Sequence, residues 1–300
     1  MDCKVLGGNT GVGACDVLAQ RIDGVIFTPK TAKIPKDTTD LLDYLLQQFN
    51  QADKGKRFFP LLGIGQATNS SEEAQVGTLG YGASIKQRNG NEIIRWDLPF
   101  SFCKSKVVTP FDGWNQGIYL VSSEGLLIGK NSLDKKDLIP FIPQQFDVVD
   151  VQPISLGTSD VQLIGIQVNF GDKLRFTDLM EFLEIGDYDA DLLQGLTDVD
   201  LTVAGHATGY VDVKVTTKCG GVDLFDTYQT ELANADVWSA INKATGSSVT
   251  PSGVTAQAVT KSFRISITAA TYLLSLASIT VLKENGIEGY ESNQITVTVQ

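Results

Sequence analysis

The chain has 300 residues, enough to bury a sizeable core in one or two domains. Its hydrophobic content of 42% is ordinary for a globular protein. The net charge of −11 argues against a protein that grips nucleic acid through a broad basic patch, because phosphate binding needs clustered Lys and Arg.

The sequence predicts a soluble protein. The first residues, MDCKVLGGNT, have neither the basic region nor the apolar core of a secretory signal. The longest nearly apolar stretch, 269–282, is too short to span a bilayer. We therefore expect synthesis in the cytosol, no membrane partner, and reduced cysteines. None of the four has the C-x-x-C spacing of a zinc or redox motif: Cys3, Cys15, Cys103 and Cys219.

Residues 1–36 are expected to form an extended N-terminal arm, because they show no helix or strand period. The glycine-rich run GGNTGVGACD (7–16) lacks the preceding strand and the Lys-Ser/Thr of a phosphate-binding loop. We read it as a flexible segment or one that a partner orders. A helix follows, since Leu41, Leu45 and Phe49 recur on one face before Lys54. It opens an expected β-rich domain over residues 37–145.

Two hairpins are predicted in this domain. The run 80–98 contains Asn89-Gly90, a dipeptide typical of the type I′ turn between two strands. The run GIYLVSSEGLLIGK (117–130) places a polar turn ending in Gly125 between two apolar strands. The second hairpin has two readings of equal weight. It is an assembly element whose sheet another subunit completes, or it is one hairpin of a closed domain.

Three prolines in residues 138–153 interrupt the strand pattern and place a domain boundary after residue 145. Residues 146–300 are expected to form a β-sandwich-like domain with one or two helices. Alternating apolar residues predict strands at 199–203, 211–215, 263–267 and 295–299, and helices are expected at 232–243 and 178–184. The fold class predicted is mainly β with a few helices, as an antiparallel sandwich or barrel.

Few residues suggest chemistry. His206 is the only histidine, which excludes a multi-histidine metal site, and its place in GHATG (205–209) favours an exposed turn residue over a catalytic base. No spacing singles out a pair of acids for hydrolysis. We therefore assign no catalytic, cofactor-binding or metal-binding residue and do not expect an enzyme. Trp96 and Trp238 are expected in the core, whereas Trp114 is either a core or an interface residue.

The segment GDYDADLLQGLTD (186–198) places three aspartates, Asp187, Asp189 and Asp191, at the first ligand positions of a calcium loop. The glycine required at the sixth position is Leu192, and the glutamate required at the twelfth is Asp198. These departures favour a solvated acidic loop, and a weak calcium site at Asp187–Asp191 stays open.

The chain opens with LGGNTGVGACDVLAQRIDGVIFTPK (6–30), an Asn-Thr-Gly and Cys opening that leads into an apolar run and a proline. This segment resembles the start of virion structural proteins from tailed phages of Bacteroidetes hosts. Two later segments also resemble phage structural proteins in their general residue pattern: VTPFDGWNQGIYLVSSEGLLIGK (108–130) and IEGYESNQITVTVQ (287–300). No functional residue is carried over from this resemblance.

The resemblance implies a virion structural protein, assembled in the bacterial host cytoplasm. Within that class we expect a tail tube subunit, typically a β-sandwich or barrel whose rings stack in an open assembly. Its partners would be itself, other virion proteins, and double-stranded DNA only in passage through the lumen. A lumen lined with acids, partly from Asp187–Asp200, would keep the DNA mobile. The alternatives are a head-associated protein (capsid decoration or fibre base) and, from another class, a carbohydrate-active hydrolase.

Overall fold

The structure is a computed structural model that describes residues 21–78, 80–151 and 162–300. It is mainly β, with 47% strand and 14% helix in several antiparallel sheets, which confirms the predicted fold class. The chain divides into two compact units. Unit 1 comprises the described residues of 1–42, 61–100 and 108–190, and unit 2 comprises residues 43–60, 101–107 and 191–300.

This division differs from the expected one. Strand β11 (Gln145–Val151) pairs with β12 (Leu163–Asp172), which pairs in turn with β7 (Asn91–Pro99). A boundary after residue 145 would remove β11 from the sheet that contains β7. The second unit of the chain instead resumes after residue 190. Pro140 and Pro143 lie between β10 (Asp137–Ile139) and β11, so they mark a change between two sheets of unit 1 and not a change of domain. Pro153 lies outside the described residues.

Unit 1 is built on a curled seven-stranded sheet with the order β2-β10-β9-β8-β1-β3, in which β13 also pairs with β9. Its strands are β1 (Ile22–Thr28), β2 (Ile34–Pro35), β3 (Phe59–Leu62), β8 (Gly117–Ser122), β9 (Leu126–Asn131), β10 (Asp137–Ile139) and β13 (Met180–Glu184). The expected extended arm over residues 1–36 is corrected from Ile22 onward, because β1 pairs antiparallel with β8. The rest of the expected arm, residues 1–20, lies outside the described residues.

The hairpin predicted at 117–130 is confirmed as β8 and β9, with Leu120 opposite Ile128 and Val121 opposite Leu127. Gly125 in its turn has φ +79°, and a Cβ there would lie 2.4 Å from Cβ of Tyr188, so both the turn and its packing require glycine. The hairpin itself offers no free strand edge, and the reading in which another subunit completes its sheet stays a prediction for the outer strands β2 and β3. Both strands already pair with other strands of the same chain, β8 with β1 and β9 with β10 and β13.

The second sheet of unit 1 has four strands in the order β11-β12-β7-β4, with β4 at Gln66–Asn69. Aromatic rings pack between it and the seven-stranded sheet. The ring of Phe27 on β1 lies 4.0 Å from that of Phe111 and 5.4 Å from that of Phe146 on β11. Trp114 joins this cluster, 5.6 Å from Phe27, and its Nε1 donates to the carbonyl of Gly117 at 3.2 Å. Trp114 is therefore partly buried against this aromatic cluster, and an interface role for its exposed part stays a prediction.

The hairpin predicted around Asn89-Gly90 does not form. Strand β6 (Ser84–Arg88) pairs with β5 (Gln75–Thr78), while β7 pairs with β12 and β4. Gly90 has another use, because a Cβ on it would lie 1.9 Å from the carbonyl oxygen of Glu72. Glycine there permits two backbone segments to pass closely and does not supply the positive φ of a type I′ turn.

Unit 2 contains a β-sandwich. Its five-stranded sheet has the order β18-β19-β15-β14-β21 and its four-stranded sheet the order β17-β16-β20-β22. The bounds are β14 (Thr197–Ala207), β15 (Tyr210–Thr217), β16 (Trp238–Asn242), β17 (Ser248–Val249), β18 (Gly253–Gln257), β19 (Ser262–Ser266), β20 (Ala270–Leu276), β21 (Tyr290–Ser292) and β22 (Ile295–Val299). The four strands predicted from alternation are confirmed as β14, β15, β19 and β22.

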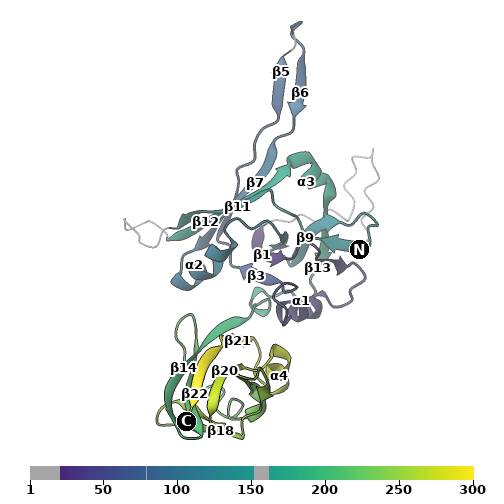
Figure 1. Ribbon diagram of the computed structural model, residues 1–300. Helices are drawn as coiled ribbons and strands as arrows, with labels where there is room; N and C mark the ends of the chain where they lie inside the picture. Colours follow the sequence, from purple (N-terminus) through teal and green to yellow (C-terminus); the bar gives the residue numbers. More distant parts are fainter. Residues whose placement is uncertain (1–20, 79, 152–161) are drawn as a thin grey trace. The chain divides into compact units, whose positions relative to one another are not determined.

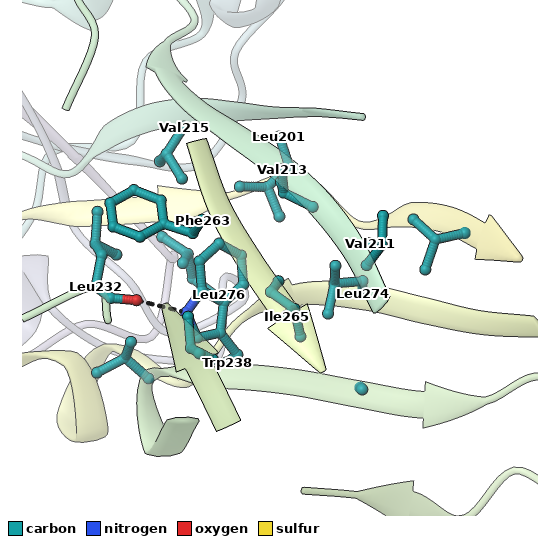
Figure 2. Packing of buried hydrophobic residues seen from close by; sticks show 14 of the residues in the cluster. Leu201, Val211, Val213, Val215, Leu232, Trp238, Phe263, Ile265, Leu274 and Leu276 are labelled. Carbon is teal, nitrogen blue, oxygen red and sulfur yellow. Dashed lines mark hydrogen bonds between the residues drawn. The ribbon is translucent and has the colours of Figure 1, made fainter. Parts of the chain in front are cut away.

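The alternating apolar residues of both sheets meet in one buried cluster. Figure 2 shows Val211, Val213 and Val215 of β15 facing the side chains of β16 and β20. Trp238 is 4% exposed, and its Nε1 donates to the carbonyl of Leu232 at 2.8 Å. The tryptophan therefore buries its ring without leaving its polar atom unpaired.

Both helices expected in the second half are misplaced. Residues 232–243 form a short 3-10 turn, η3 (Ala235–Val237), followed by strand β16. Trp238 and Ala240 are buried while Ser239 and Ile241 are partly exposed, which is the period of a strand. Residues 178–184 are mostly β13, because the helix α3 (Lys173–Leu179) ends where that strand begins.

The helix expected after residue 36 is confirmed as α1 (Leu41–Phe49), which buries the predicted stripe of Leu41, Leu45 and Phe49. The remaining helical elements are short: α2 (Phe102–Val108), α4 (Ile279–Glu284), η1 (Thr109–Phe111) and η2 (Ala190–Leu192). No described helix has the length and hydropathy needed to cross a membrane.

Unit 2 includes two segments, 43–60 and 101–107, whose flanking chain belongs to unit 1. Arg57 holds the first: it is 4% exposed, and its guanidinium lies 2.8 Å and 3.3 Å from the two carboxylate oxygens of Glu291. The second is held by a disulfide between Cys103 on α2 and Cys219, whose Cα atoms are 5.5 Å apart. The expectation that all four cysteines are reduced is therefore corrected for this pair.

Replacing Glu291→Gln should destabilise unit 2 by about 3–5 kcal/mol, because it leaves the buried charge of Arg57 unneutralised. The measurement is urea unfolding followed by tryptophan fluorescence. Glu288→Gln is the matched control, since the ion pair of Glu288 with Lys283 is mostly exposed and should contribute little. Equal stability of the two variants would contradict this role for Arg57.

The ion pair of Arg57 with Glu291 makes the stability of unit 2 depend on pH. Burial acts to raise the pKa of Glu291, but hydrogen bonds and charge from Arg57, with Lys54, bring it below its ordinary value of 4.5. The stabilisation is therefore present above that value and is lost as the pH falls through the lower pKa of the folded state. The Glu291→Gln variant should lack this acid-dependent component.

The disulfide closes a sequence separation of 116 residues, so reducing it should cost roughly 4–5 kcal/mol by loop entropy. Peptide mapping of the oxidised protein should recover Cys103 and Cys219 in one linked fragment. Cys103→Ser should unfold at the same urea concentration as the reduced wild type. A wild-type protein whose stability does not respond to reductant would contradict the link.

Candidate assembly surface

The most exposed structured part of the chain is a two-stranded ribbon formed by β5 and β6. We call residues 75–88 the arm. Figure 1 shows the arm projecting from unit 1 past the end of β7. Every described residue of the arm is exposed except Gly77, which is partly buried. The arm thus gains almost nothing from burial within its own subunit.

Apolar side chains lie on both faces of the arm. Val76 pairs with Lys86 and Gly77 with Ile85, so Val76 and Ile85 point to opposite faces. Val76 is 61% exposed, Ile85 46%, and Tyr81 near the tip 81%. A ribbon with an apolar side chain on each face is suited to insertion between two surfaces.

The root of the arm is fixed to unit 1. The Nδ2 of Asn89 donates to Oδ2 of Asp172 at 2.8 Å, and the backbone N–H of Lys173 donates to the carbonyl of Gly90 at 2.9 Å. The guanidinium of Arg88 lies 3.5 Å from the carboxylate of Glu72. The direction in which the arm leaves the sheet is therefore set by bonds at its base.

Two strands form a stable unit in water only when they pack against something else. Both outer edges of the arm also carry backbone N–H and C=O groups that pair with no third strand among residues 21–78, 80–151 and 162–300, where its sheet consists of β5 and β6. The arm can thus add to a sheet edge of another molecule or be covered by its face.

None of the candidate chemical residues belongs to the arm. His206 is exposed near the end of β14, and its side chain has no hydrogen bond or ion pair to any described residue. Asp187, Asp189 and Asp191 are exposed. Among the described residues, no group of three or more His, Cys, Asp or Glu side chains is arranged to hold a metal ion. The weak calcium site at Asp187–Asp191 stays an untested alternative.

Sequence reasoning missed the arm because Asn89-Gly90 placed the predicted turn after the strand Ser84–Arg88, whereas the turn of the arm comes before that strand. A signal was available in QVGTLGYGASIKQR (75–88), where glycines at 80 and 82 punctuate two polar strands. Gly82 has φ +84°, which suits the tip of the hairpin.

The chain matches no protein-family model and no curated protein sequence.

Replacing Val76, Tyr81 and Ile85 together by Ser should weaken self-association and leave the free energy of unfolding almost unchanged, because all three side chains are exposed. Sedimentation velocity over a concentration series measures the first quantity, and urea unfolding the second. Val222→Ser with Val259→Ser is the control, since these valines are 58% and 99% exposed in unit 2. Loss of association in the control alone would contradict a role for the arm.

Proposed function

We propose that this chain is a virion structural protein of a tailed phage, and that it serves as a tail tube subunit. In this role, copies assemble into rings that stack around a DNA conduit. The subunits are made in the cytoplasm of the bacterial host and function in the virion, in contact with themselves and other virion proteins.

The observation that carries this proposal is the arm. It offers two unpaired strand edges and an apolar side chain on each face, all presented to solvent at a fixed root. An isolated subunit that exposes such edges is prone to edge-to-edge association, and an assembly covers them. The segments 6–30, 108–130 and 287–300 resemble phage structural proteins and suggest a virion assembly. The arm is the part of the chain through which subunits would associate in it.

Charge is consistent with a conduit. The chain carries 35 acidic and 24 basic residues, and a net negative lumen would leave a passing duplex weakly bound. Exposed carboxylates such as Asp198 are candidates for this lining. In a head decoration protein, the same charge excess would serve solubility on an outer surface.

The test is negative-stain microscopy of the purified protein across a range of concentrations. The proposal predicts rings or tubes with an open centre. A protein that stays monomeric under every condition, with or without virion partners, would contradict it. Closed shells or binding to capsids without a central channel would assign the chain to the head instead.

A further inference from the structure

A basic groove lies at the root of the arm, on a chain that is acidic overall. Two adjoining hollows of about 510 and 630 Å³ share Asn89 and Asp172 in their walls. One extends along β6 and the other extends to β9 and α3. Their walls carry four cations, Lys86, Arg88, Lys130 and Arg175, against the two carboxylates of Asp172 and Asp178. We call this surface the basic groove.

Most of these cations lack a counter-ion. Within the described part of the chain, Lys86, Lys130 and Arg175 form no ion pair, and Arg88 reaches only Glu72. Lys130 is half-buried beside Arg175, and burial and then the charge of Arg175 lower its pKa. An anion seated between these two cations would offset both effects.

The carboxylate of Asp172 is already engaged. Its Oδ1 accepts from the backbone N–H of Arg175 at 3.0 Å, where it caps α3, and its Oδ2 accepts from Asn89 at 2.8 Å. These hydrogen bonds lower the pKa of Asp172. This carboxylate orders α3 and the root of the arm and is not placed to neutralise Lys130.

The rest of the groove wall is apolar at the end near Lys130. Leu133 is fully exposed, Leu174 is 51% exposed and Leu179 is 36% exposed. Apolar side chains beside a cation pair suit a peptide that carries a carboxylate next to an apolar residue. They offer nothing to a sugar-phosphate backbone, which makes polar and charged contacts.

We propose that the basic groove binds an acidic peptide segment of a second copy of this chain. This inference rests on the proposed function only in taking the partner to be another copy. The loop Asp187–Leu192 has the required composition, with three carboxylates and a leucine that is 50% exposed. Seating it in the groove would place it at a subunit interface and leave other carboxylates to line the conduit.

The direct test uses the full chain and a fluorescent peptide of residues 186–192, GDYDADL, followed by anisotropy at low and physiological salt. Lys130→Gln with Arg175→Gln should weaken binding about tenfold or more. Arg175→Gln alone, at an exposed helix position, keeps the test valid if the double variant fails to fold. The protein control is Lys218→Gln with Lys283→Gln, which removes two exposed cations from unit 2. The peptide control replaces its three aspartates by Asn.

Binding that is lost with the Asn peptide and in the groove variant, and kept in the unit 2 control, supports the inference. Equal binding by the groove variant and the wild type would overturn it. So would displacement of the peptide by inorganic phosphate at the same concentration, or tighter binding of a DNA duplex. The peptide assay does not depend on assembly, so the two proposals can fail separately. Normal rings formed by the Lys130→Gln, Arg175→Gln variant would contradict this inference and leave the tube proposal standing. Peptide binding by a protein that forms no rings would support this inference and contradict the tube proposal.

Discussion

Unit 1 depends on the pairing of the β8–β9 hairpin. Its two strands lie inside the seven-stranded sheet, between β1 on one side and β10 and β13 on the other. All six residues of β8 are buried, as are the first four of β9. Backbone groups removed from water in this way must find partners within the chain, and here they do. The seven-stranded sheet thus depends on a hairpin whose turn requires glycine at Gly125.

The pairing of this hairpin within the sheet makes the arm the more exposed candidate for assembly. A hairpin paired on both sides has no edge of its own to offer, whereas the arm has two edges that pair with no other described strand, and its described residues are almost all exposed. The bonds of Asn89 and Gly90 fix the base of the arm, and the basic groove opens beside that base. An exposed ribbon and a groove with more cations than carboxylates thus lie together in unit 1. Both are features that a second molecule would satisfy.

The sequence was most informative where one period ran without interruption. The alternating valines at 211, 213 and 215 and the stripe of Leu41, Leu45 and Phe49 both took the predicted form. The sequence led to wrong predictions where a local turn or helix signal was overridden by contacts with residues distant in the chain. Asn89-Gly90 is a strong turn dipeptide, yet the close passage of Glu72 decides the conformation at Gly90.

The other failures have the same origin. Residues 232–243 allow a helix locally, but β20 pairs with Trp238–Asn242 and takes the segment into the sandwich. The pairing of Cys103 with Cys219 is invisible in their spacing, because only the folded unit brings them together. The candidate assembly surface could likewise not be predicted from local sequence signals. His206 is exposed as expected, but it lies on β14 and not in the predicted turn. The arm and the basic groove depend on which strands do not pair and which cations converge.

Hydrogen–deuterium exchange of the arm amides tests the account most directly, because strand addition would give partners to the outward N–H groups of β5 and β6. Exchange of residues 75–88 should be fast in dilute protein and slow in the associated form. Exchange at exposed turns of unit 2, such as Thr208–Gly209, should stay unchanged. Equal exchange of the arm in the dilute and associated forms would contradict its role as the assembly element.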